Sequence, residues 1–180
     1  MLHAQSAVGL ELDSLADVVT SGVAPAIVMV QLLSKATTGN YLIISDVLSV
    51  TEGGTRFSHF FPFMGLLIAV ASAYRLAKFN VDTRQTSSFI GLPTPANTLF
   101  IISLPLILHF QSSEIAESII LNKWILLALT IVSCILLNSE IKLFGLKYKT
   151  WDFQKNIIRY VYLILSAILI IWLHFIAIPI

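Results

Sequence analysis

The sequence predicts an all-α membrane protein: a polytopic transmembrane helical bundle of about five spanning helices, forming a single membrane-embedded domain over residues 1–180. Of the 180 residues, 57% are hydrophobic and only 12% are charged. The mean hydropathy is +0.87, whereas soluble domains carry about a quarter of their residues as charged side chains. The apolar residues also gather in runs close to the ~20 residues that a helix needs to cross a bilayer.

Five apolar runs predict the spans, and polar or proline-containing stretches separate them. The first run follows an acidic segment, and the third opens at prolines that suit the first turn of a helix. The shorter runs fall slightly under the length that a bilayer requires. In chain order the expected spans are Ala7 to Leu33, Phe57 to Lys78, Pro95 to Phe110, Ile119 to Leu137 and Asn156 to Ile178. Tyr41 to Val50 is apolar but short and carries Asp46, so we expect an interfacial piece there.

The basic residues predict the orientation of the chain, because cytoplasmic loops of membrane proteins are enriched in lysine and arginine. If Met1 faces the cytoplasm, the cytoplasmic side holds Arg75, Lys78, Arg84, Lys142, Lys147, Lys149, Lys155 and Arg159, and the other side holds Lys35, Arg56 and Lys123. This distribution predicts a multi-pass protein of the cell membrane whose first helix begins on the cytoplasmic side.

The strongest sign of chemistry is an acidic segment at the start of the first span. Asp13 and Asp17 stand four residues apart, with Glu11 beside them, directly before an apolar run. Charged side chains in or near hydrocarbon are costly and usually have a function. Residues at i and i+4 share one helix face, so the two aspartate carboxylates converge. Two convergent carboxylates favour a hard divalent cation such as Mg²⁺ or Mn²⁺, which prefers oxygen ligands.

Two further polar segments follow. Arg75 to Asn80 lies at the end of the second expected span, where basic residues either anchor a helix by reaching toward lipid headgroups or bind an anionic ligand. Gly91 to Asn97 carries two prolines at the start of the third span. Asn97 falls just inside that helix, and an amide in a low-dielectric setting needs a polar partner, whether another helix or a ligand.

These segments resemble the CDP-alcohol phosphatidyltransferase family, whose signature reads D-x-x-D-G-x-x-A-R, eight or nine residues, then G-x-x-x-D-x-x-x-D. Gly9, Asp13 and Asp17 match its second half. The strings ELDSLADVV with GVAP behind it, RLAKFN, and FIGLPTP are similar to the phosphatidylserine synthase branch, CDP-diacylglycerol–serine O-phosphatidyltransferase. The three matches occur in the expected order, and the resemblance covers residues 1 to about 160.

The first half of the signature is absent, because only eight residues precede Gly9. We therefore expect the family domain to be N-terminally incomplete here, with one or two further helices upstream that would carry the missing motif. A degenerate paralogue is the alternative. The 180-residue chain would then carry only half of its metal site, and we expect it to release no CMP.

The resemblance implies transfer of the phosphatidyl group from CDP-diacylglycerol to L-serine, giving phosphatidylserine and CMP. It implies a two-metal site with Mg²⁺ or Mn²⁺, in which Asp13 and Asp17 are metal ligands and Asp17 is also the catalytic base. Gly9, which has no side chain, would let the nucleotide or a neighbouring helix come close. Substrate binding would involve Arg75, Lys78 and Asn80. By analogy with the family, a homodimer in the lipid bilayer is expected.

Other readings stay open at this stage. A sibling enzyme would use glycerol phosphate or an inositol phosphate as the acceptor alcohol. A transporter or channel would use Asp13 and Asp17 to bind a permeating cation, but transporters often show internal repeats and we find none here. An inactive membrane fragment would also account for the missing half of the motif. No nucleic-acid partner is expected.

Overall fold

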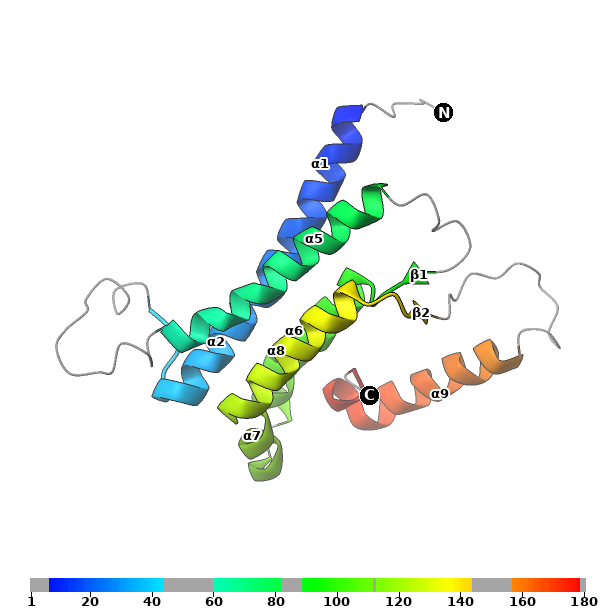
Figure 1. Ribbon diagram of the computed structural model, residues 1–180. Helices are drawn as coiled ribbons and strands as arrows, with labels where there is room; N and C mark the ends of the chain where they lie inside the picture. The colour runs from blue at the N-terminus through cyan, green and yellow to red at the C-terminus, as the bar shows by residue number, and fades with distance from the viewer. Residues whose placement is uncertain (1–6, 44–59, 82–88, 112, 144–156, 179–180) are drawn as a thin grey trace.

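The computed structural model describes residues 7–43, 60–81, 89–111, 113–143 and 157–178, and in these residues the fold is helical, as the sequence predicts (Figure 1). The helical elements in chain order are α1 (Ala7–Val18), η1 (Val19–Val23), α2 (Ala24–Thr38), η2 (Phe61–Leu66), α5 (Leu67–Val81), α6 (Thr94–Phe110), α7 (Glu114–Ile120), α8 (Lys123–Asn138), α9 (Ile157–Leu173) and η4 (His174–Ala177). Two short strands, β1 (Phe89–Ile90) and β2 (Lys142–Leu143), pair antiparallel.

The first three helical elements form one rod with a change of winding in the middle. Between α1 and α2, the η1 segment is a π-helix, a form that is rare and often found at functional sites. The Thr20 hydroxyl donates a hydrogen bond to the Ala16 carbonyl oxygen at 2.9 Å. The rod ends at Gly39, whose φ of 80° is left-handed and whose N–H donates to the Lys35 carbonyl. The acidic segment and the bundle interior therefore lie on one continuous helical element.

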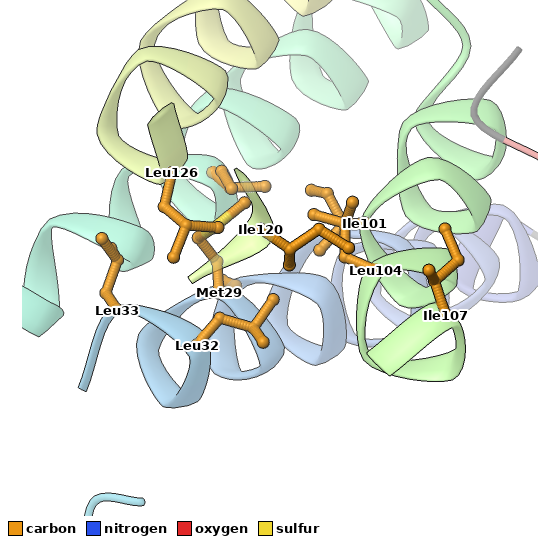
Figure 2. Packing of buried hydrophobic residues seen from close by; sticks show 10 residues of the cluster. Met29, Leu32, Leu33, Ile101, Leu104, Ile107, Ile120 and Leu126 are labelled. Carbon is orange, nitrogen blue, oxygen red and sulfur yellow. The ribbon is translucent and has the colours of Figure 1, made fainter. Parts of the chain in front are cut away.

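The hydrophobic core forms where α2, α5, α6, α7 and α8 meet. Figure 2 shows side chains from α2 and α6 pointing into the space between these helices, where Ile120 and Leu126 also lie. Members of this core cluster are Ala26, Met29, Leu32, Leu33, Ile68, Ile101, Leu104, Ile107, Ile120 and Leu126. Gly65 in η2 lies so near α2 that an added Cβ would stand 2.8 Å from the Val30 backbone nitrogen. This close approach explains why a residue without a side chain occupies position 65.

The expected number of about five spans is wrong for the described residues. Two helical stretches are long and apolar enough to cross a bilayer, Glu11–Thr38 and Phe61–Asn80. A third span would exist if the bent pair Glu114–Ile120 and Lys123–Asn138 counted as one. The first two correspond to the first two predicted spans, although residues 57–59 of the second lie outside the described part. The predicted interfacial piece, 41–50, is described only as far as Ile43.

Helix length and breaks explain the difference. The third predicted span is α6, which has 17 residues with Pro105 inside it, and at 1.5 Å per residue this is about 26 Å, less than the ~30 Å of hydrocarbon. The fourth is broken before α8, because Asn122 caps a new helix by accepting a hydrogen bond from the Trp124 N–H at 3.0 Å, and the two parts are bent by 59°. The last, α9, also has 17 residues before the chain tightens into η4.

The segment that leads into α6 is held against the end of α8. Gly91 adopts a left-handed φ of 75°, and its N–H donates to the Ile141 carbonyl at 2.9 Å. The Leu92 N–H donates to the Leu136 carbonyl at 3.1 Å. An added Cβ on Gly91 would stand 2.7 Å from the Ser139 carbonyl oxygen. The start of α6 is thereby fixed beside the last turn of α8.

Candidate functional site

The two aspartates lie on the exposed part of α1, which extends beyond the core alongside α5 (Figure 1). Asp13, Asp17 and Gly9 are all exposed. Their spacing of four places them on one face of the helix, one turn apart. Within the described ranges, no group of three or more His, Cys, Asp or Glu residues is placed to hold a metal ion. The aspartates therefore offer the right hard oxygen donors for Mg²⁺ or Mn²⁺, but only as part of a coordination shell.

The rotation of α1 is set by a contact with the end of α5. The Asn80 side-chain amide donates a hydrogen bond to the Ser14 hydroxyl oxygen at 2.9 Å. Successive residues of an α-helix are about 100° apart, so Ser14 faces α5 and Asp13 and Asp17 lie beside that contact, not against it. Glu11 lies about 160° around the helix from Asp13 by the same geometry. The structure thus places Asn80 next to the aspartate face, through Ser14.

Arg75 is buried, with 8% of its surface exposed. Its Nε donates to the Leu92 carbonyl oxygen at 2.6 Å, and its Nη2 lies 3.4 Å from the Gly91 carbonyl oxygen. These contacts tie α5 to the segment before α6. The two polar segments that the sequence singled out, 75–80 and 91–97, are thus in direct contact, and Arg75 shapes the entrance to α6.

Lys78 has a different environment, because it lies at the surface. Its ammonium nitrogen is 3.2 Å from a carboxylate oxygen of Glu140, and the two side chains are 40% and 69% exposed. Exposed pairs of this kind contribute about 0–1 kcal/mol. Lys78 can therefore exchange Glu140 for another anion at little cost, which a buried pair could not do.

Below the aspartates, four contacts close a ring around one level of the bundle. The Thr98 hydroxyl of α6 donates to the Ser21 carbonyl of η1 at 3.0 Å. Gly22 of η1 lies against Ser72 of α5, since an added Cβ would stand 3.1 Å from the Ser72 Cβ. The remaining two contacts join α8 to its neighbours: the Asn138 amide lies 3.4 Å from the Ala71 carbonyl of α5, and the Leu136 carbonyl accepts from Leu92, just before α6.

Three buried polar atoms at this level have no hydrogen-bond partner among the residues that the structure describes: Ser72 Oγ, Asn97 Nδ2 and Asn138 Oδ1. Ser72 is fully buried and Asn97 is 1% exposed. Leaving a buried donor or acceptor unpaired costs about 1–3 kcal/mol each, so these groups call for a partner. We name Ser72, Asn97 and Asn138 the polar layer.

The sequence pointed to only part of this arrangement. The aspartate spacing and Asn97 were visible in the sequence as polar residues at the edge of apolar runs. Ser72 and Asn138 were missed, because a serine within an apolar helix and an asparagine at a helix end are both common and unremarkable in sequence. Their signal appears only once the helices are packed together.

Comparison with known proteins places these residues in a family. The sequence profile of CDP-alcohol phosphatidyltransferase matches residues 1–136. Three curated relatives carry the name CDP-diacylglycerol–serine O-phosphatidyltransferase. The Helicobacter pylori protein is 30% identical over 138 residues, 74% of this chain and 49% of that protein. The Mycobacterium tuberculosis protein is 35% identical over 122 residues (63% and 35%), and the Bacillus subtilis protein 34% over 98 residues (52% and 42%).

The chain spans about half the length of these curated relatives, or less. No solved structure matches it. The profile match extends from α1, with its aspartates, into α8, so it covers the aspartate face, the Arg75 contacts and most of the ring beneath them. On this match the chain belongs to the CDP-alcohol phosphatidyltransferase family.

Proposed function

We propose that this protein transfers the phosphatidyl group from CDP-diacylglycerol to L-serine and releases phosphatidylserine and CMP. The observation that carries the proposal is the aspartate face of α1, with Asp13 and Asp17 one turn apart and exposed at the end of an apolar helix. The family match supplies the CDP-alcohol chemistry, and the names of the relatives favour serine as the acceptor.

The reaction is a displacement at phosphorus. The serine hydroxyl oxygen forms a bond to the phosphorus that carries diacylglycerol, and the bond from that phosphorus to the CMP oxygen breaks. The proton of the serine hydroxyl has to be removed, and we propose the Asp17 carboxylate as its acceptor. CMP leaves with the electron pair of the broken bond, so negative charge builds up on the leaving phosphate.

Asp13 and Asp17 would hold the divalent cations, together with ligands from outside the described residues and from the substrate. When bound, Mg²⁺ or Mn²⁺ would neutralise the charge of the pyrophosphate and stabilise the attacking and the leaving oxygens of the displacement. The protein contributes positioning: the Asn80 contact to Ser14 fixes the rotation of α1. Lys78, held by an exposed and weak ion pair, is available for phosphate or for the serine carboxylate.

The placement in the cell follows from the same proposal. Candidate membrane helices and a family of membrane enzymes support a membrane protein. We also propose an active site on the cytoplasmic side of the cell membrane: with Met1 in the cytoplasm, the spans Glu11–Thr38 and Phe61–Asn80 leave Lys78 and Arg84 on the same side as the aspartates. We further propose a homodimer in the bilayer, as expected for the family.

An acceptor panel tests the proposal. The protein at its full natural length, in lipid nanodiscs with CDP-diacylglycerol and Mg²⁺ or Mn²⁺, should release CMP with L-serine and form phosphatidylserine. Release with glycerol phosphate or inositol phosphate should be at least tenfold slower. A preference for either phosphorylated alcohol would overturn the serine assignment, and no CMP release with any acceptor would overturn the proposed activity as a whole.

A further inference from the structure

The polar layer has a composition that is unusual for the interior of an apolar bundle. It combines an amide donor (Asn97 Nδ2), a hydroxyl (Ser72 Oγ) and an amide acceptor (Asn138 Oδ1); each atom is buried and has no partner in the described part of the chain. The three belong to three helices, α6, α5 and α8. Two other buried hydroxyls, those of Ser103 and Thr130, differ from Ser72 because they donate to carbonyls of their own helix at 2.6 and 2.9 Å.

The layer also lies close to the aspartate face. Ser21 follows Asp17 by four residues on the same helical rod, and its carbonyl accepts the hydrogen bond from Thr98, the residue next to Asn97. Four residues of helix correspond to about 6 Å along the axis. This is comparable to the length of a serine molecule. A serine with its charged groups in the layer would span this axial distance, with its hydroxyl on the side of Asp17.

The unpaired groups match the charges of a free amino acid. A carboxylate accepts hydrogen bonds, which is what Asn97 Nδ2 and the Ser72 hydroxyl can donate. An ammonium donates hydrogen bonds, which is what Asn138 Oδ1 can accept. A phosphorylated alcohol would instead require cationic side chains, and Arg75, one turn from Ser72 on α5, already donates to the Leu92 and Gly91 carbonyls.

We propose that the polar layer binds the amino-acid acceptor, with Asn97 and Ser72 on its carboxylate and Asn138 on its ammonium group. The inference rests on the proposed function and deepens it, because it assigns to three residues the discrimination of an amino acid from other alcohols. Occupation by the ligand gives each buried group the partner that it lacks.

Steady-state kinetics of the full-length protein test the inference. Asn97→Ala should raise the KM for serine by about tenfold or more, while the KM for CDP-diacylglycerol changes less than twofold. Asn97→Asp should raise the KM for serine further, because the new aspartate carboxylate would repel the carboxylate of serine. Asn138→Leu should also raise the KM for serine, whereas Asn138→Asp should retain serine binding, since an acidic group suits an ammonium.

Acceptor analogues separate the two ends of the ligand. Ethanolamine lacks the carboxylate of serine. Asn97→Ala should therefore lower the ratio of kcat/KM for serine to kcat/KM for ethanolamine by about tenfold. Asn122→Ala serves as the matched asparagine control, because Asn122 only caps the N-terminus of α8, and Thr130→Ala as the control for a buried hydroxyl. Both should leave the KM for serine unchanged even if they lower stability.

The outcomes distinguish this inference from the proposed function. If the wild type uses serine but Asn97→Ala and Asn138→Leu fold and leave its KM unchanged, the inference is overturned and the function stands. If a variant does not fold, Ser72→Ala and Asn97→Gln replace it. If the wild type releases no CMP, serine-dependent thermal stabilisation decides: stabilisation lost in Asn97→Ala supports the inference, and its absence in the wild type overturns it.

Discussion

Replacing Gly91 by alanine should destabilise the protein through two separable effects. Gly91 has a left-handed φ of 75°, which costs a residue with a Cβ about 1–2 kcal/mol. The new Cβ would also stand 2.7 Å from the Ser139 carbonyl and 3.0 Å from the Leu137 carbonyl. Both neighbours are backbone atoms, so the segment at Gly91 has to move away from the end of α8.

That movement would weaken the hydrogen bonds that the segment makes. The Gly91 N–H to Ile141 and the Leu92 N–H to Leu136 are lost or stretched, at about 1 kcal/mol each. The Arg75 contacts to the carbonyls of residues 91 and 92 move with them. We expect a total loss of about 3–4 kcal/mol in the free energy of unfolding, the sum of the φ cost and the two backbone bonds.

Gly39→Ala is the matched control, because Gly39 has nearly the same φ, 80°, but its added Cβ would meet no neighbour within 4 Å among the described residues. It should lose only the φ cost of about 1–2 kcal/mol. Equilibrium unfolding in mixed detergent micelles measures both variants. Equal losses for Gly39→Ala and Gly91→Ala would refute the claim that the entrance to α6 is pressed against α8.

Two further predictions concern packing and charge. Gly65→Ala should lower the free energy of unfolding, because its Cβ would meet the Val30 backbone nitrogen at 2.8 Å. The expected loss is about 1–3 kcal/mol, the usual cost of overpacking. A variant as stable as the wild type in the same unfolding assay would show that η2 and α2 are not in close contact. A double-mutant cycle on Lys78→Met and Glu140→Gln should give a coupling energy below about 1 kcal/mol that falls as salt is added, because both side chains are exposed. A larger coupling energy that does not depend on salt would contradict the conclusion that this ion pair is weak.

The sequence was sufficient for the fold class, because apolar runs of membrane length have few structures open to them other than helices. The number of spans was not predictable in the same way. A run such as Ile119 to Leu137 reads as one apolar stretch, yet Asn122 starts a new helix within it. A short polar residue that caps a helix and one that is tolerated inside a span look the same in sequence.

The candidate site, too, was predictable from the sequence only in part. The aspartate face was predictable because its residues are four positions apart on one helix. The contact between Ser14 and Asn80 joins residues 66 positions apart, and the polar layer draws on three helices. Such contacts depend on how helices cross and on the rotation of each about its axis, which local patterns do not specify.

The central claim, that the aspartate face of α1 carries the chemistry, is tested most directly by CMP release from CDP-diacylglycerol and serine in charge-removing variants. Asp13→Asn and Asp17→Asn in the full-length protein should each lower the rate by about 10² or more, the usual effect of removing an essential acid–base or metal-binding group. Glu11→Gln, on the opposite face of the same helix, should leave it within about twofold. Near wild-type release in either aspartate variant, or an equal loss in Glu11→Gln, would contradict the account.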